Sequence, residues 1–462
     1  MQEQTRACPS ALRRFHQSRP RTLQRQLSRY VFIFIFKNVA PNAAHHQPLA
    51  VTYSEAIDWL YELRLLGSKL GLKNPRALAA HAGNPHERLR FTHVAGTNGK
   101  GSVCAMLESI CREAGMKTGL FTSPHLLSFR ERIQVNRQPV SEAQVVRLVE
   151  CLQALMRNFP ADRLPTFFEV VTVMALEHFA REEVDIVLWE TGLGGRLDAT
   201  NIVTPLASVI TPIDLDHQQY LGYSLEQIAA EKAGIIKPGI PVFSAPQETP
   251  AEAVLQEHAR QANASLTITA GEEPVALLGR HQRQNAALAK RVAQAVWPEI
   301  AEATITNGLA KVQWAARAQC FEMGDRKVVI DAAHNPASAE AFADVLQEDF
   351  AGQRPTLLLG MLADKNWDSN VATLAPLAGR VVCVPVNSER GLNPDQLAIA
   401  ARAHCAEVEC AGSVSAGWEL VRSEPLVAVT GSLYLIGEVM DSLGLADAID
   451  EPNLNEWKIS KT

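Results

Sequence analysis

The sequence predicts an α/β protein with two domains, each built on a parallel β-sheet that helices cover on both faces. Three observations support this fold class. The chain has 462 residues, about three times the length of a typical domain. Short apolar strand patterns alternate with helical patterns, and a helical, polar stretch at residues 250–320 divides the strands into two sets. We place the domain boundary near Gln319, so that the domains span residues 49–318 and 319–446.

The individual elements follow from the spacing of apolar residues. Residues 53–66 have helical apolar spacing, and the apolar residues of the 103–110 segment recur at i, i+3, i+4 and i+7, which is typical of an amphipathic helix. Short apolar runs between these helical patterns predict strands. The strands are expected at residues 90–94, 186–189, 207–211, 328–331, 357–359, 381–384 and 426–429.

Composition excludes several classes of protein. The chain is 47% hydrophobic and 20% charged, which excludes collagen, coiled coil and wholesale disorder. No apolar run approaches the roughly 18 residues that a transmembrane helix needs. The eight cysteines form no CxxC pair, so we expect reduced thiols in a cytosolic enzyme rather than a disulfide framework or a zinc site.

The charge is distributed unevenly. The net charge is −6, but residues 1–50 carry eight basic residues and one acid, a balance of +7, so the remainder carries −13. That acidic remainder argues against nucleic acid as a partner. Residues 1–48 are rich in arginine, and we interpret them as either a disordered leader on a cytoplasmic protein or an organellar transit peptide. This leader and a tail at residues 447–462 are left outside both domains.

The strongest local signal is the segment 95–102, Ala-Gly-Thr-Asn-Gly-Lys-Gly-Ser, which follows a predicted strand and begins a predicted helix. Its glycines let backbone N–H groups converge on a phosphate, and the helix N-terminus adds about half a positive charge. Lys100 is expected to reach the β- and γ-phosphates of a nucleotide. The strict P-loop pattern fails, because Val94 and Gly101 stand where Gly and Ser or Thr are expected. A glycine-rich turn with a chance lysine is the alternative, but the strand–turn–helix order favours a P-loop ATPase-like domain.

Polar residues at two later strand ends and on one helix extend this candidate site. Glu190 ends a buried-type strand, where ligands of open α/β sheets bind, and a carboxylate there is a natural Mg²⁺ ligand. His217 follows the next strand and would ligate a metal or orient a phosphate, unless it is a capping or packing histidine. Lys232 is expected on a helix, where the alternative is a solvated surface lysine.

Six motifs occur in order along the chain, namely GTNGKGS (96–102), TSPHL (122–126), ETGLGGRLDATN (190–201), DH-x3-LG (216–222), EKAGIIKPG (231–239) and DAAHNP (331–336). Together they resemble the folylpolyglutamate synthase/dihydrofolate synthase family of the Mur ligase superfamily. The resemblance covers about residues 52–445. It implies that the P-loop ATPase-like parallel sheet domain is followed by a smaller C-terminal Rossmann-like α/β domain, the glutamate-ligase domain.

The resemblance implies an ATP-dependent amide ligase. Members of the family phosphorylate a pterin-linked carboxylate with ATP, and the amine of L-glutamate then attacks the acyl phosphate. We expect glutamate to be added to dihydropteroate, to tetrahydrofolate (poly)glutamates, or to both. The implied cofactors are ATP and Mg²⁺. The expected partners are these small molecules, without nucleic acid or membrane, and the chain is expected to act as a monomer.

The resemblance also implies roles for residues that match the family's motifs. ATP would be held by Thr97, Asn98, Gly99, Lys100, Gly101, Ser102, Asn285, Arg317, Asp331 and His334. Mg²⁺ would be held by Ser123, Glu190 and His217. The pterin would be bordered by the 67–70 turn and by Thr166, Phe167, Phe168, Glu169, Leu197, Asp198 and Ala199. Lys232 would be the family's carbamylated lysine, which supplies a carboxylate to a second Mg²⁺, and Lys100, His217 and Lys232 would be catalytic.

One departure from the family's pattern lies at the domain junction. The family usually has Pro-Gly-Arg there, whereas this chain has Trp314-Ala315-Ala316-Arg317. Arg317 is kept, and the resemblance implies that it contacts the β- and γ-phosphates while Asp331 contacts the ribose. Alanine adopts a positive φ less easily than glycine, which leaves the geometry of this hinge open.

Two alternative functions are compatible with parts of this sequence. A Mur ligase of peptidoglycan synthesis would need an extra N-terminal domain for a UDP-sugar, and residues 49–90 provide barely two helices. A non-catalytic nucleotide-binding switch would bind ATP without glutamate-dependent turnover. It would leave the placement of Glu190, His217 and Lys232 at one edge of a sheet unexplained.

Overall fold

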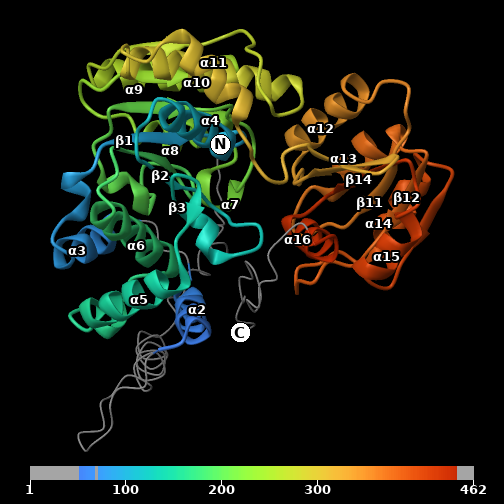
Figure 1. Cartoon of the computed structure of the whole chain (residues 1–462), viewed down its shortest axis with the longest axis horizontal. Coiled ribbons are helices and arrows are strands. Elements are labelled where there is room, and N and C mark those ends of the chain that lie inside the picture. The colour runs from blue at the N-terminus through green and yellow to red at the C-terminus, as the bar shows by residue number, and fades with distance from the viewer. Residues whose placement is uncertain (1–50, 68–70, 445–462) are drawn as a thin grey trace, which may run out of the picture.

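The computed structural model describes residues 51–67 and 71–444, so the predicted leader 1–48 and tail 447–462 lie outside the described residues. Two α/β domains lie side by side (Figure 1), one around an eight-stranded sheet and the other around a six-stranded sheet. The predicted fold class is confirmed. Within the described ranges, no helix is long and apolar enough to span a bilayer.

The N-terminal domain is built on the eight-stranded sheet, in the order β4-β3-β2-β5-β1-β6-β7-β8. Its strands are β1 Phe91–Ala95, β2 Thr118–Phe121, β3 Ile133–Val135, β4 Gln138–Pro139, β5 Ile186–Glu190, β6 Ala207–Ile210, β7 Val242–Ser244 and β8 Leu266–Ile268. The central strand β1 pairs in parallel with both β5 and β6. The carboxyl ends of the central strands therefore meet at one edge of the sheet.

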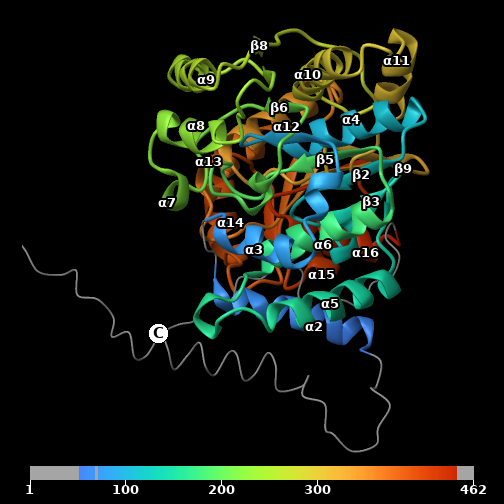
Figure 2. The ribbon, with the colours of Figure 1, turned by 90° about the vertical axis from the view of Figure 1, so that its left-hand side faces the viewer.

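Helices cover both faces of this sheet. They are α2 Tyr53–Glu62, α3 Lys73–His81, α4 Lys100–Glu113, α5 Glu142–Met156, α6 Phe167–Arg181, α7 Gln218–Leu221, α8 Leu225–Ala233, α9 Thr249–Gln261, α10 Arg280–Val296 and α11 Glu302–Lys311. Val187 and Trp189 of β5 pack with α2, α5 and α6, whereas Leu188 packs with α4, α10 and α11. Figure 2 shows these two layers on opposite sides of the strands. Because successive strand residues face opposite layers, a strand buried on both faces reads as a continuous apolar run.

The C-terminal domain has the strand order β13-β12-β11-β14-β10-β9. Its strands are β9 Gln319–Met323, β10 Arg326–Asp331, β11 Thr356–Leu359, β12 Arg380–Cys383, β13 Val408–Cys410 and β14 Leu426–Thr430, and its helices are α12 Pro336–Glu348, α13 Trp367–Leu374, α14 Pro394–Arg402, α15 Val414–Val421 and α16 Leu433–Ser442. Helices α12, α13 and α14 pack on one face of the sheet, and α15 and α16 pack on the other.

Six short 3₁₀ helices complete the described elements. They are η1 Leu63–Leu66, η2 Pro85–Arg88, η3 Phe129–Arg132, η4 Ala161–Arg163, η5 Ala199–Ile202 and η6 Ala375–Leu377. The first of them follows α2 directly, so the helical pattern predicted at residues 53–66 is confirmed as one α-helix with a 3₁₀ end.

All seven predicted strands are present, as β1, β5, β6, β10, β11, β12 and β14. The predicted sheets are parallel at their centres, and antiparallel strands extend them at one side: β3 runs antiparallel to β2 and β4, and β9 runs antiparallel to β10. A two-residue turn between β3 and β4 permits only an antiparallel pair. The edge strands β4 and β9 are partly exposed, and β3 is interrupted by the polar Gln134, so these strands lack the continuous apolar run that marks the central strands.

Candidate active site

The candidate phosphate loop, residues 96–99, joins the end of β1 to the start of α4. Gly96 and Gly99 have φ values of 153° and 83°. A Cβ would lie 1.8 Å from Thr211 Oγ1 at the first position and 2.8 Å from Asn285 Oδ1 at the second. Only glycine fits both positions. The contact at Gly99 also brings the predicted Asn285 against the loop.

Lys100 is the first residue of α4, and its Nζ donates to the carbonyl oxygen of Thr97 at 3.1 Å. The Thr97 hydroxyl donates to the carbonyl oxygen of Asp214 and accepts from its N–H, both at 3.0 Å, which ties the loop to the segment after β6. Ser102 is buried in the first turn of the same helix. The start of α4 thus combines helical N–H groups with an ammonium, which favours a polyanion.

Glu190 ends β5, between β2 and β1 in the sheet. It is 4% exposed, and its Oε2 accepts from the Ser123 N–H at 2.9 Å. Burial raises the pKa of the Glu190 carboxyl, whereas Lys100, the Ser123 N–H and Arg317 oppose this rise. The structure therefore brings the predicted acid, the loop lysine and the linker arginine within electrostatic reach of one another.

His217 follows β6 and precedes α7, with a φ of 50°. The side chain is 47% exposed, and the part that is covered lowers the pKa of the imidazole, as do the charges of Lys365, Lys100 and Lys232, although Asp216 opposes this shift. At neutral pH the ring is therefore uncharged, which is the form that binds a metal ion. Lys100 thus acts on both His217 and the carboxylate described above.

Lys232 is buried, which excludes the alternative of a solvated surface lysine. It lies near the end of α8 with 4% of its surface exposed, and its Nζ donates to the carbonyl oxygen of Gly96 at 2.7 Å. Burial lowers its pKa well below the usual range, and Lys100 adds to the effect. Helix α8 therefore delivers a second amine to the phosphate loop.

The C-terminal domain contributes Asp331, the last residue of β10, and His334, three residues later and before α12. The Asp331 Oδ2 accepts from the Ala318 N–H at 2.7 Å, and the His334 Nδ1 donates to the carbonyl oxygen two residues before it at 2.8 Å. Burial raises the pKa of Asp331 to about 6, and Arg317 opposes this rise. The charge of Arg317 also lowers the pKa of His334, so this arginine faces polar groups of both domains.

Direct contacts of Asn335 and Lys365 join the domains beside this site, and the Asn335 Nδ2 lies 3.5 Å from Asp216 Oδ2. The Asn335 Nδ2 donates to Asn98 Oδ1 at 3.2 Å, and the Lys365 Nζ lies 3.4 Å from Asp216 Oδ1. Sequence reasoning missed Lys365, and it noted Asn335 only as part of the DAAHNP motif. No local pattern marks Lys365, because its partner lies 149 residues away along the chain.

The predicted pterin residues at 166–169 form the start of α6. The Glu169 carboxylate accepts from the N–H and hydroxyl of Thr166 at 2.7 and 2.9 Å, which caps the helix. Phe168 packs on Gly192, where a Cβ would lie 2.4 Å from its ring. The 166–169 segment therefore touches the glycine-rich loop that follows β5.

The second predicted pterin segment, residues 197–199, lies in that same loop. The Asp198 carboxylate accepts from three backbone N–H groups of its own loop, at 2.8–3.0 Å. Asp198 also acts on the pKa of Lys232, which places the segment beside the phosphate site. The carbonyl oxygen of Leu197 accepts from the Gly71 N–H at 3.2 Å, and Ala199 begins η5. Of the predicted 67–70 turn, only residue 67 is described.

A basic and aromatic group beside Phe167 was missed by sequence reasoning. The guanidinium carbons of Arg64 and Arg132 lie 4.9 and 5.4 Å from the centre of its ring. Arg132 is buried, and its Nε donates to His125 Nδ1 at 2.6 Å. His125 stands in the TSPHL motif, which was the only sequence signal for this group.

The domain linker has a left-handed backbone at two alanines, which settles the hinge geometry that the sequence analysis left open. Ala316 and Ala318 have φ values of 57° and 46°, and both methyl groups are buried. Alanine thus takes the conformation for which the family's pattern has glycine. The burial of these methyl groups offsets part of the conformational cost.

The fold and this site together define the Mur ligase class. The model of the Mur ligase middle domain matches residues 94–277, and that of the Mur ligase glutamate ligase domain matches residues 316–433. A dihydrofolate synthase/folylpolyglutamate synthase of Bacillus subtilis is 34% identical to the chain over 426 residues, which cover 85% of this chain and 99% of the relative.

Solved structures agree with these matches. The folylpolyglutamate synthase of Thermotoga maritima superimposes with a TM-score of 0.77 at 32% identity, over 88% of this chain and 99% of that one. Escherichia coli FolC in complex with DHPP and ADP gives a TM-score of 0.75 at 31% identity, over 84% of this chain and 98% of that one. The chain belongs to the folylpolyglutamate synthase/dihydrofolate synthase family.

Proposed function

We propose that this chain is an ATP-dependent ligase that adds L-glutamate to dihydropteroate, to tetrahydrofolate (poly)glutamates, or to both. The observation that carries the proposal is that Glu190 ends β5 beside the end of β1, where the phosphate loop with Lys100 begins, and that the linker residue Arg317 acts on the same carboxyl. Relatives supply the substrate class, since the Bacillus subtilis protein is named for both activities and the Escherichia coli structure holds DHPP and ADP. The peptidoglycan alternative is not favoured by these relatives.

Such a ligase must first make a carboxylate reactive. The substrate carboxylate attacks the γ-phosphorus of ATP and ADP leaves, which gives an acyl phosphate. The glutamate amine then attacks its carbonyl carbon, loses a proton and displaces phosphate. Catalysis of this kind depends on positioning and charge neutralisation. Lys100 and Arg317 would neutralise the phosphate charge, while the backbone N–H groups at the start of α4, residues 99–102, would orient the phosphates.

The candidate Mg²⁺ residues fit a cation that keeps several water ligands. Glu190 uses one oxygen for the Ser123 N–H, and no described residue donates to the other. His217 is uncharged at neutral pH. Among the residues that the structure describes, no group of three or more His, Cys, Asp or Glu side chains could hold a metal by itself, which agrees with the few protein ligands of Mg²⁺ sites. When bound, the cation would neutralise phosphate charge.

Carbamylation of Lys232 is part of the proposal. Its buried amine has a lowered pKa, which favours the neutral form that reacts with CO₂, and a carbamate would place a negative charge near Lys100. The Lys232→Ala variant should be inactive and partly restored by acetate, which can supply the missing carboxylate. Activity of the variant without acetate would contradict this assignment.

The remaining assignments rest on the same placement. The pterin would lie between the 166–169 and 197–199 segments, and the nucleotide would contact Asn285, Asp331 and His334.

We also propose that the domains divide after residue 318, since β9 begins at Gln319, and that the protein is a cytoplasmic monomer. All seven cysteines in the described residues are free, as expected in a reducing compartment. Gel filtration tests the monomer.

Two assays on the purified full chain test the function. One supplies ATP, Mg²⁺, L-glutamate and dihydropteroate, and the other replaces dihydropteroate with tetrahydrofolate. We expect glutamate-dependent ADP release in both, with each product one glutamate heavier by mass spectrometry. If ADP is released with tetrahydrofolate but not with dihydropteroate, the chain has no dihydrofolate synthase activity. If no ADP is released in either assay, the ligase proposal is overturned and the nucleotide-binding switch is favoured.

A further inference from the structure

The linker between the domains is held from both sides, with one residue between the two sets of contacts. On the N-terminal side, the carbonyl oxygen of Gln313 accepts from Arg137 Nη2 at 2.9 Å, and the Arg137 guanidinium carbon lies 5.3 Å from the centre of the Trp314 ring. On the C-terminal side, the carbonyl oxygen of Ala316 accepts from the Ala332 N–H at 3.0 Å. Residue 315 is therefore the point at which the linker passes from one domain to the other.

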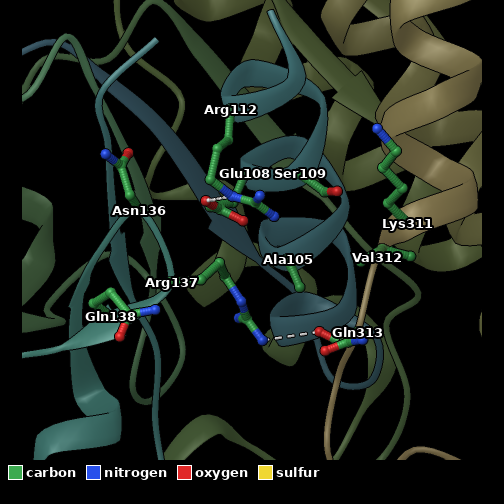
Figure 3. A pocket seen from close by; sticks show the side chains of 10 residues that line it. All are labelled: Ala105, Glu108, Ser109, Arg112, Asn136, Arg137, Gln138, Lys311, Val312 and Gln313. Carbon is green, nitrogen blue, oxygen red and sulfur yellow. Dashed lines mark hydrogen bonds and ion pairs between the residues drawn. The ribbon is translucent and has the colours of Figure 1, made fainter. Parts of the chain in front are cut away.

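Arg137 occupies an unusual position for a large side chain. It is the second residue of the turn between β3 and β4, where residues 136 and 137 have φ values of 50° and 66°. This two-residue hairpin turn normally favours glycine at its second position. Figure 3 shows the Arg137 side chain crossing a hollow of about 290 Å³ between the hairpin, α4 and the linker, with its guanidinium directed at Gln313.

Trp314 connects this contact to the phosphate loop. A Cβ at Gly101 would lie only 2.9 Å from Trp314 Cζ2, so the indole rests against the residue that follows Lys100. This packing explains why the chain has Gly101 where a strict P-loop has Ser or Thr. A side chain at residue 101 would displace Trp314 from the start of α4.

We propose that Arg137 is a positioning residue of the ligase, which acts through Gln313 and Trp314 to hold the linker against the start of α4. Arg317 stands three residues after Trp314, so a fixed linker keeps this arginine where its charge reaches Glu190. Loss of the Arg137 contacts would lower the fraction of molecules in which Arg317 is in place. Turnover then falls in proportion to that fraction. This inference rests on the proposed function only where turnover is the readout.

The test uses the full chain with Arg137→Gly, because glycine suits the turn and the variant should fold at least as well as the parent. We expect kcat to fall about tenfold, while KM for the pterin substrate stays within twofold because residues 166–169 and 197–199 are not altered. The melting temperature should be unchanged or higher. Arg137→Lys, which can still donate to Gln313, should recover part of the lost turnover. The matched control is Lys311→Ala, which lines the same hollow but pairs with Glu113 rather than the linker.

Hydrogen exchange of the linker gives a readout that does not need activity. Backbone N–H groups in residues 313–317 should exchange at least fivefold faster in Arg137→Gly than in the parent or in Lys311→Ala, with α5 unchanged. Unchanged linker exchange would overturn the contact, and faster exchange with an unchanged kcat would overturn the positioning role. A general loss of melting temperature together with kcat would also overturn it. If the parent itself lacks glutamate-dependent turnover, the proposed function fails while linker exchange still decides this inference.

Discussion

Lys100 is the side chain on which the phosphate site depends most directly. It begins α4 and acts electrostatically on Glu190, His217 and Lys232. Lys100→Ala should abolish measurable ATP hydrolysis, since removal of one transition-state donor typically costs roughly 10²–10³ in rate. The measurement is ADP release under saturating substrates.

A matched control for this variant is Lys117→Ala, which removes a half-exposed lysine paired with Glu182 in the same domain. It should retain nearly normal turnover. Near-normal turnover of Lys100→Ala itself would remove the phosphate-loop assignment.

The raised pKa of Asp331 makes the stability of the folded protein depend on pH. Its pKa is about 6 in the folded protein against 3.8 for an ordinary Asp, because it is buried. The unfolded chain therefore loses this proton first, so the stability that the protonated form supplies is complete below pH 3.8 and is lost as pH rises toward 6. The difference between these two pKa values corresponds to a loss of about 3 kcal/mol in the free energy of unfolding. Asp331→Asn should gain stability relative to the parent as pH rises from 5 to 7.5.

Urea unfolding at both pH values measures this difference. Asp325→Asn, in the exposed turn between β9 and β10, is the control and should track the parent at each pH. A constant gap between Asp331→Asn and the parent would show that Asp331 does not titrate in this range.

At the scale of elements, the β1–loop–α4 unit depends on Gly96 and Gly99, at which an added Cβ would collide with a neighbouring side chain. Gly99→Ala and Gly83→Ala both place alanine at a positive φ, of 83° and 79°, at a cost of roughly 1–2 kcal/mol each. Only at Gly99 would the new Cβ meet a side chain, that of Asn285 at 2.8 Å; at Gly83 nothing lies within 4 Å. We therefore expect Gly99→Ala to lose at least as much stability as Gly83→Ala, and a loss of ATP affinity of tenfold or more in Gly99→Ala alone.

Calorimetric titration with ATP, combined with urea unfolding, separates these two effects. Equal ATP affinity of the two variants would mean that the loop tolerates a side chain at residue 99 and does not hold the nucleotide closely.

The elements also differ in how easily they are recognised from the sequence. Strand β5 is buried on both faces and its sequence is a continuous apolar run, whereas β3 lies near the edge of the sheet and has no such run.

At the scale of the whole molecule, the two domains meet through Lys365 and Asp216, each 16% exposed. Lys365→Ala would leave Asp216 without its cross-domain cation, beside His217. We expect kcat/KM to fall at least tenfold, equivalent to about 1.4 kcal/mol, because the partly buried Asp216 carboxylate loses its cross-domain lysine and keeps only its contacts with His217 and Asn335. The control Lys327→Ala breaks an exposed pair of the same domain, with Glu322 at 4.0 Å, and should change kcat/KM little. Steady-state kinetics on both variants decide the outcome.

Much of the candidate site could be predicted because its signals are local. The phosphate loop was recognisable since glycines, a lysine and a helix start must follow a strand within a few residues, and Glu190 and His217 were recognisable as polar residues at strand ends. Lys232 carried no such signal: a lysine in a helical pattern reads the same whether it is solvated or, as here, bonded to Gly96. The roles of these residues stay predictions until the variants above are measured.

The sequence by itself determined seven of the strands, most of them at the centres of the two sheets, the helical pattern that begins α4, the phosphate loop and the family. These depend on periodicity and on steric limits that act within a few residues. The tertiary structure decided the strand order, the antiparallel edges, the burial of Lys232, the reach of Lys365 to Asp216 and the contact of Arg137 with the linker. Each of these joins residues far apart along the chain, and such pairs become neighbours only when the sheets and the two domains pack.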